Sequence, residues 1–226
     1  MAGSFDRPNP LARALRGGAV SDLLGPRTAI KRRAYFAFHF DDVMRVNNVR
    51  KAFGREFCDS SLWESRQLEG DEALKRLIRG GVEYTSVVCV LIGSYTYRRR
   101  WVRYEIARAV IDGRGLLGVH INGIPHHRDY SRHQRGFNPL AYMGVGKVQE
   151  NALALPRYYL YELAPQGWER YADHTAPVTR PPYLPDPSSG YVMPLVNGTI
   201  ERDYVEHAGS LLLGTWIDAA AQAAGR

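Results

Sequence analysis

The sequence contains few cysteines and no long hydrophobic run. Its 226 residues include two cysteines, Cys58 and Cys89, whose number and spacing fit neither a disulfide framework nor a metal site. No apolar run approaches the roughly 20 residues that a membrane-spanning helix needs. The first thirty residues also lack the continuous apolar segment of a secretory signal. We therefore expect a cytoplasmic protein that does not interact with a membrane.

Net positive charge is small outside the amino-terminal segment. The formal net charge is +7, but residues 1–33 contain seven basic and two acidic residues, which leaves about +2 for the rest of the chain. This distribution argues against nucleic acid as a partner. One nucleic-acid function remains as an alternative, in which the protein binds nucleic acid through its basic leader.

The composition predicts a leader followed by one domain. Residues 1–30 mix Gly, Pro, Arg and Ser with one short amphipathic piece, and we interpret them as a basic flexible leader. Residues 31–226 are long enough for one domain with elaborations. Within it, the Pro-rich stretch 173–198 is expected to be an irregular surface loop. A final helix is expected to start at Asp203, with its buried face formed by Val205, Ala208, Leu212, Trp216 and Ala219.

Strand and helix patterns alternate along the domain. Apolar runs predict buried strands at 33–40, 87–92 and 115–121. The predicted helices have apolar faces formed by Val46, Val49, Phe53 and Phe57, by Leu74, Leu77, Ile78 and Val82, and by Val102, Ile106, Ala109 and Val110. A last, edge-like strand over 157–163 is expected to form a hairpin with Trp168. The fold class is therefore α/β, with a flavodoxin-like, open and mostly parallel sheet flanked by helices.

The loop 122–137 contains three histidines, His126, His127 and His133. They have neither a second set of ligands nor a helical i,i+4 pair, so we predict no metal site.

The segment 85–112 is the expected centre of the fold. A buried strand ends at Gly93-Ser94, and a helix is expected from about Tyr97. Trp101 and Glu105 lie four residues apart and form a stripe beside its buried face. We expect the Glu105 carboxylate to be partly desolvated and to face the loop that leaves the strand. The alternative is an ordinary helix-surface glutamate paired with Arg103 or Arg108.

Ligands of such sheets bind outside the carboxyl ends of the strands, at the switch point between the first and third strands. Here those ends are Phe38-His39-Phe40-Asp41 and Ile92-Gly93-Ser94-Tyr95. Both lead towards Trp101 and Glu105, so we expect three separate segments to meet in one crevice.

These segments resemble the TIR-like domains of bacterial anti-phage Thoeris systems, in the subgroup that makes a nucleotide signal. The likeness covers roughly residue 31 to the end. It is carried by Ala37–Asp41, Arg45–Arg50, Asp59–Glu64, Cys89–Ser94, Arg99–Ile106 and Gly118–Ile121. In that family the carboxylate of a Trp-x-x-x-Glu pattern is the catalytic group, and this pattern corresponds here to Trp101 and Glu105.

The resemblance implies an enzyme that cleaves NAD and produces a cyclic ADP-ribose-type nucleotide, which activates an effector protein. NAD is then the substrate, and no cofactor is needed. We assign NAD binding to Phe38 and Trp63 over the base or ribose, to Gly93 and Ser94 through backbone N–H groups near a phosphate, and to His39, Asp41 and Trp101. The loop that contains Trp63 is interpreted as a lid, with a local packing role as the alternative.

Two further functions remain open. A TIR-type adaptor would only assemble with other proteins, and a simple NAD hydrolase would release linear ADP-ribose. We also expect a homo-oligomer and an activator derived from the phage.

Overall fold

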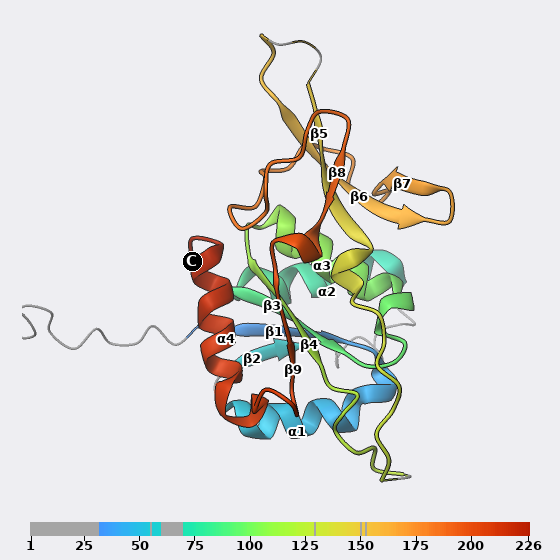
Figure 1. Cartoon of the computed structure of the whole chain (residues 1–226), viewed down its shortest axis with the longest axis vertical. Helices are drawn as coiled ribbons and strands as arrows, with labels where there is room; N and C mark the ends of the chain where they lie inside the picture. The colour runs from blue at the N-terminus through green and yellow to red at the C-terminus, as the bar shows by residue number, and fades with distance from the viewer. Residues whose placement is uncertain (1–31, 55, 60–69, 129, 150, 152) are drawn as a thin grey trace, which may run out of the picture. The chain divides into compact units, whose positions relative to one another are not determined.

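The computed structural model describes residues 32–54, 56–59, 70–128, 130–149, 151 and 153–226, and Arg32–Arg226 forms one compact unit. The leader and Trp63 lie outside the described residues. The helices are α1 (Val43–Phe53), α2 (Asp71–Glu83), α3 (Arg100–Ile111) and α4 (Gly209–Ala223). The strands are β1 (Ala34–Phe38), β2 (Phe57–Asp59), β3 (Val87–Ile92), β4 (Gly115–His120), β5 (Met143–Val148), β6 (Arg157–Ala164), β7 (Gly167–Arg170), β8 (Val192–Pro194) and β9 (Ile200–Asp203) (Figure 1).

A parallel five-stranded sheet forms the centre of the fold. Its strand order is β2-β1-β3-β4-β9, and every neighbouring pair is parallel. This confirms the predicted flavodoxin-like α/β sheet. The strands β1, β3 and β4 are buried along their whole length, which explains why their sequences are continuous apolar runs rather than alternating ones.

Successive side chains of β1 enter different cores. Tyr35 and Ala37 pack with α2 and α3, whereas Phe36 and Phe38 pack with α1 and α4 on the opposite face. Figure 1 shows helices on both sides of this sheet. The alternation determines which residues of β1 can contact α3.

A second sheet, with the order β7-β6-β5-β8, is antiparallel. Leu160 of β6 and Met143 of β5 belong to the same core as α2 and α3. The predicted hairpin is confirmed as β6 and β7, but β6 is an inner strand and not an edge. The sequence did not predict β5, because Gly144 and Gly146 interrupt its apolar pattern. At Gly146 a Cβ atom would lie 2.5 Å from the Tyr161 ring, so the glycine leaves room for that ring.

Two boundaries differ from the sequence expectations near α1 and in the Pro-rich stretch. Helix α1 ends at Gly54, which adopts φ +60°, so Phe57 belongs to β2 and not to the helix. The stretch 173–198 is mostly irregular as expected, but it also contains β8. Directly after it, β9 adds an edge to the parallel sheet beside β4.

The last helix begins later than predicted. The Asp203 carboxylate accepts hydrogen bonds from the N–H groups of Val205 and Glu206, but this makes a turn and not a helix start. Ala208 then adopts a left-handed conformation, and α4 starts at Gly209. The buried face is consequently Leu213, Trp216, Ile217 and Ala220, while Val205 and Leu212 are exposed.

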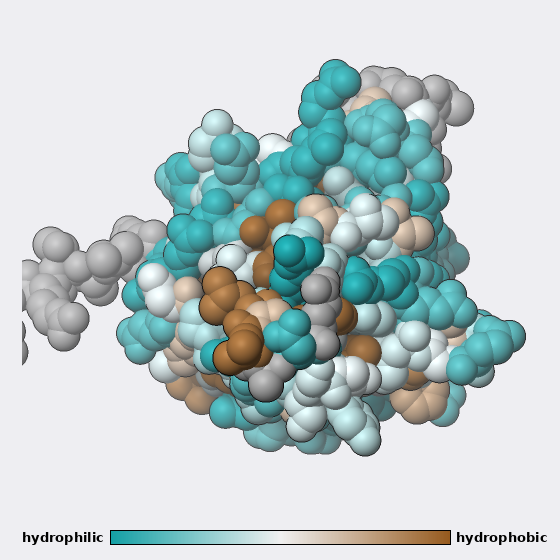
Figure 2. Space-filling model, turned by 90° about the horizontal axis from the view of Figure 1, so that it is seen from above, coloured by the Kyte–Doolittle hydropathy of each residue, from teal (hydrophilic) through white to brown (hydrophobic). Residues whose placement is uncertain are grey.

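The connection between β5 and β6 carries exposed leucines. Leu153 and Leu155 are 97% and 89% exposed, and Figure 2, which views the molecule from this end, shows hydrophobic side chains gathered there. None of the described helices combines the length and apolar character needed to cross a bilayer.

Candidate active site

Glu105 lies in the second turn of α3, which begins at Arg100. The helix starts three residues later than expected because Thr96–Arg98 forms a separate 3-10 turn. The Thr96 hydroxyl accepts a 2.9 Å hydrogen bond from the Gly93 N–H and thereby stabilises this turn. The Gly93 N–H is therefore already used, which removes one of the two backbone donors that we assigned to a phosphate.

The Glu105 side chain is buried and bound by a tyrosine. Glu105 is 1% exposed, and the Tyr35 hydroxyl donates a 2.8 Å hydrogen bond to its Oε1 atom. The expectation of a carboxylate at the edge of the buried face was therefore wrong. Glu105 belongs to the buried face itself, because Tyr35 extends from β1 to meet it.

Helix α2 makes room for this contact. A Cβ atom at Gly81 would lie 2.7 Å from Cε2 of Tyr35. A side chain at that position would displace the aromatic ring, so the glycine allows Tyr35 to lie between β1 and α2.

The alternative assignment of Glu105 to a surface ion pair is also wrong. Arg108 pairs with Asp112, and Arg103 pairs with Glu162 at 3.3 Å. Both arginines therefore neutralise other carboxylates.

Trp101 lies one helical turn before Glu105. Its indole packs partly buried against the core, edge-on to Tyr104 at 6.0 Å. The Arg100 guanidinium lies 4.9 Å from the indole ring centre. Because a helix that follows a parallel strand runs back along the sheet, Trp101 lies nearer than Glu105 to the carboxyl ends of the strands.

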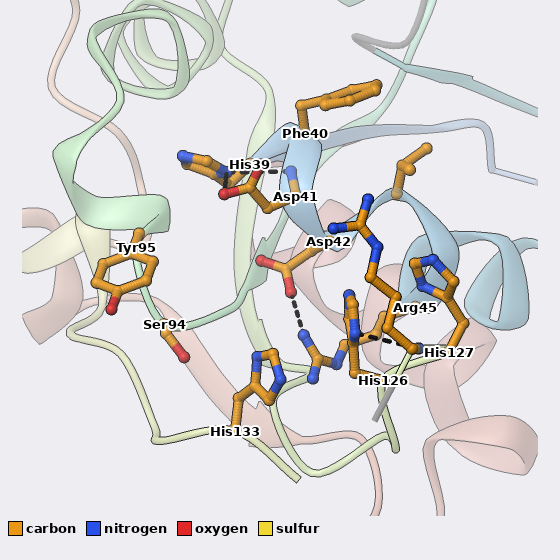
Figure 3. Close-up of a pocket in the computed structure, with 12 residues that line it drawn as sticks. His39, Phe40, Asp41, Asp42, Arg45, Ser94, Tyr95, His126, His127 and His133 are labelled. Carbon is orange, nitrogen blue, oxygen red and sulfur yellow. Dashed lines mark hydrogen bonds and ion pairs between the residues drawn. The ribbon is translucent and has the colours of Figure 1, made fainter. Parts of the chain in front are cut away.

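A cavity of about 290 Å³ lies at the carboxyl ends of β1 and β3 (Figure 3). It is lined by His39, Phe40, Asp41, Asp42, Val43, Arg45, Ser94, Tyr95, His126, His127, Arg128 and His133. The expected convergence of the first and third strands is thus confirmed. Trp101 and Glu105 are not among the residues that line this cavity, so the crevice expected to join all three segments stays a prediction. Tyr35 and His39 are four residues apart, which is about 13 Å along an extended chain.

A buried ion pair forms one wall of the cavity. Arg45 donates a 2.7 Å hydrogen bond to the Asp42 carboxylate and a 2.8 Å bond to the Ile124 carbonyl. A Cβ atom at Gly93 would lie 1.8 Å from Oδ2 of Asp42. Asp42 therefore makes no capping bond to α1, and its carboxylate instead connects three segments of the chain.

His39 is positioned as a neutral hydrogen-bond donor. Burial lowers the pKa of His39, while Asp41 acts in the opposite direction and Arg99 in the same one. Its Nδ1 atom accepts a 3.2 Å hydrogen bond from the Asp41 N–H, so the proton of the neutral ring lies on Nε2. This N–H group can bind a ligand oxygen.

Phe38 and Ser94, two further residues that we assigned to NAD binding, both contact other parts of the protein. Phe38 is buried on the opposite face of the sheet from Glu105, with the Arg50 guanidinium 5.4 Å from its ring centre. This placement does not support the assigned contact of Phe38 with a base. Ser94 lines the cavity, and its hydroxyl donates a 2.6 Å hydrogen bond to the Gln134 carbonyl.

The loop 122–137 contributes three histidines to the cavity, which the sequence did not predict. The His126 ring lies 4.4 Å from the His127 ring and 4.9 Å from the His133 ring. Among the described residues, no group of three His, Cys, Asp or Glu side chains is arranged to hold a metal ion. The sequence analysis also missed Tyr35, although a hydroxyl in a strand buried on both faces signals a required partner.

The comparisons with known proteins concern most of the chain. The model of the TIR-like domain of Thoeris protein ThsB matches residues 35–125, a span that includes Tyr35, the β1–α1 connection and Glu105. A protein of Bacillus cereus (strain MSX-D12), named "Putative cyclic ADP-D-ribose synthase ThsB1", is 35% identical over 196 residues. The match covers 83% of this chain and 99% of that protein.

Proposed function

Because the chain belongs to the ThsB family of Thoeris TIR-like proteins, we propose that it cleaves NAD and makes a cyclic ADP-ribose-type signal in anti-phage defence. The name of the Bacillus cereus relative assigns cyclic ADP-ribose synthesis to that relative. The observation in this chain that supports the proposal is the buried Glu105 carboxylate, held by the Tyr35 hydroxyl.

A single carboxylate suits the cleavage step. Breaking the bond between nicotinamide and ribose develops positive charge on the ribose, and a nearby carboxylate stabilises that charge. Nicotinamide leaves as a neutral base, so the step needs no general acid. We assign the stabilising role to Glu105, and Tyr35 orients it by holding Oε1.

The product depends on which nucleophile reacts with the ribose. An acceptor group of the same ADP-ribose gives a cyclic nucleotide and releases a proton, whereas water gives linear ADP-ribose. Enclosure of the site favours the internal acceptor, because it excludes water and holds the two ends of the substrate together. The cyclic nucleotide would then act on an effector protein as a diffusible signal.

The cavity at the carboxyl ends of β1 and β3 is our candidate for the polar part of NAD. His39, Asp41 and Ser94 line it, and the Nε2–H group of His39 suits a phosphate or ribose oxygen. Trp101 lies between the carboxyl ends of the strands and Glu105, where an indole can cover the nicotinamide or the ribose. The contact assigned to Trp63 stays a prediction, as do the homo-oligomer and the phage-derived activator.

The decisive experiment compares the protein with its Glu105→Gln variant. Each is incubated with NAD, with and without lysate from infected cells, and nucleotides are identified by mass. We expect nicotinamide and a cyclic nucleotide from the unmodified protein and neither product from the variant, because an amide cannot offset the developing charge. Glu169→Gln, which changes an exposed carboxylate of β7, is the matched control. Normal product formation by folded Glu105→Gln would overturn the assignment.

A further inference from the structure

A groove of about 540 Å³ lies between α2 and α3, away from the cavity described above. Its charged lining consists of Arg76, Arg79 and Glu83 of α2, and of Arg108, Asp112 and Arg114 at the end of α3 and just beyond. Residue 114 immediately precedes β4. The groove therefore lies at the amino edge of the parallel sheet, opposite the edge that carries His39 and Ser94.

Positive charge dominates this groove. Four guanidinium groups face two carboxylates, and one carboxylate, that of Asp112, is already paired with Arg108. Arg226 adds a further guanidinium at the rim, where it donates hydrogen bonds to the carbonyls of Asp112 and Gly113. Burial lowers the pKa of Arg114, and repulsion from Arg226 lowers it further. Such an arrangement of like charges costs free energy that a bound anion would offset.

The hydrogen-bonding state of these arginines also favours an acceptor. Within the part of the chain that the structure describes, the buried Nε atoms of Arg108 and Arg114 have no hydrogen-bond partner. Arg114 uses one terminal nitrogen for the Glu83 carbonyl at 2.8 Å. Arg76 and Arg79 are exposed on α2, and their guanidinium groups are free to reorient towards a ligand.

We propose that this groove binds a phosphorylated small molecule through its phosphate groups. A guanidinium group can donate two hydrogen bonds to a phosphate, and the two exposed arginines of α2 face two partly buried ones, Arg108 of α3 and Arg114 just beyond that helix. Inorganic phosphate, pyrophosphate and a nucleoside diphosphate share this chemistry. They differ in the number of phosphate groups and in the presence of a nucleoside, so comparing their affinities shows which of these parts the groove recognises.

The groove is connected to Glu105 along α3 and through the packing of α2 against Tyr35. Arg108 follows Glu105 by three residues on α3, one turn along the same helix. Gly80 lines the groove, and its neighbour Gly81 packs against the Tyr35 ring. An anion that draws α2 and α3 together therefore stabilises the contact between Tyr35 and Glu105. We expect it to raise NAD turnover, and this second step rests on the proposed function.

The binding test does not depend on NAD cleavage. The full chain is titrated with phosphate, pyrophosphate and ADP at constant ionic strength, and binding is measured by calorimetry. We expect saturable binding that weakens at least tenfold in Arg76→Gln/Arg79→Gln. The control Arg132→Gln/Arg157→Gln removes the same charge from exposed positions outside the groove and should bind like the unmodified protein. Equal binding by both double variants, or no saturable binding of any probe, would overturn the site.

The coupling has its own readout. NAD turnover is measured with and without the tightest of the three anions, in the unmodified protein and in Arg76→Gln/Arg79→Gln. We expect a several-fold increase in kcat that is absent from the groove variant. If the anion binds and turnover of an active enzyme is unchanged, the site stands and its connection to Glu105 is wrong. If the protein cleaves no NAD while the groove variant loses anion binding, the proposed function fails and the site remains.

Discussion

The Tyr35 hydroxyl lies 2.8 Å from Oε1 of Glu105, and both side chains are buried. Tyr35 comes from β1 and Glu105 from α3, so the hydrogen bond joins the sheet to the helix that covers it. A carboxylate in such surroundings needs a donor to offset its lost hydration. The same donor also fixes the direction of the carboxylate, which a reaction at a developing positive charge requires.

Tyr35→Phe removes the hydroxyl and keeps the aromatic ring. A hydrogen bond to a charged group contributes about 1.5–3 kcal/mol, so we expect NAD turnover to fall by roughly 10- to 100-fold. The ring still fills its place, but the buried Glu105 carboxylate loses a donor, so the melting temperature should also fall. Steady-state kinetics and thermal melting of the variant test this role. Unchanged kcat would show that Tyr35 is a packing residue only.

Gly81→Ala and Gly80→Ala form a matched pair in α2. The added methyl at Gly81 meets the Tyr35 ring at 2.7 Å, whereas a methyl at Gly80 meets nothing within 4 Å. Overpacking of this kind costs about 1–3 kcal/mol, while alanine stabilises an open helix position by about 0.5–1 kcal/mol. We therefore expect urea unfolding to shift in opposite directions. A similar shift in both variants would contradict the close packing at Gly81.

Asp42→Asn tests the ion pair beside the cavity. The substitution leaves the Arg45 guanidinium, which is 2% exposed, without its carboxylate. Removal of one partner from a buried pair costs about 3–5 kcal/mol, and we expect a loss of this size in chemical unfolding. Asp41→Asn is the control, since the Asp41 side chain is 75% exposed. Equal effects of the two variants would show that the pair contributes nothing specific.

Stability should fall as the pH is lowered through the histidine range. Burial lowers the pKa of His39, His120 and His174 below the ordinary histidine value of 6.5. The unfolded chain therefore binds more protons than the folded one below about pH 6.5, so stability rises with pH across that window. Unfolding at pH 7.5, 6.5 and 5.5 measures the slope. His120→Gln should reduce this slope, because it removes a buried imidazole that takes up a proton on unfolding. An unchanged slope in this variant would show that His120 does not contribute to the pH dependence.

Much of the parallel sheet could be predicted from short-range patterns. The runs at 34–38, 87–92 and 115–120 are mostly apolar and are buried throughout, because strands covered on both faces need no alternation. The order of strands and helices then restricts the topology, since right-handed crossovers leave few arrangements. The protein family could likewise be predicted from the segments around Trp101 and Glu105, where several motifs occur close together.

The second sheet and the start of α4 could not be predicted in this way. Strand β5 has glycines where Tyr161 of β6 needs space, and that requirement depends on a strand far along the chain. The face of α4 depends on Ala208, whose left-handed backbone changes the phase of the helix relative to Asp203. Helical periodicity predicts a face only when the first residue of the helix is known.

The sequence by itself determined that Glu105 is the candidate carboxylate, and the tertiary structure decided where it lies and which side chain contacts it. The Trp-x-x-x-Glu pattern identifies Glu105, but its depth depends on Tyr35, 70 residues earlier, and on the missing side chain at Gly81. In the same way, Gly93 follows a strand, yet its lack of a Cβ is needed because the Asp42 carboxylate occupies that space. Local patterns follow from backbone geometry and burial along one element. Contacts between elements depend on the packing of side chains that are distant in the sequence, and only the folded chain brings them together.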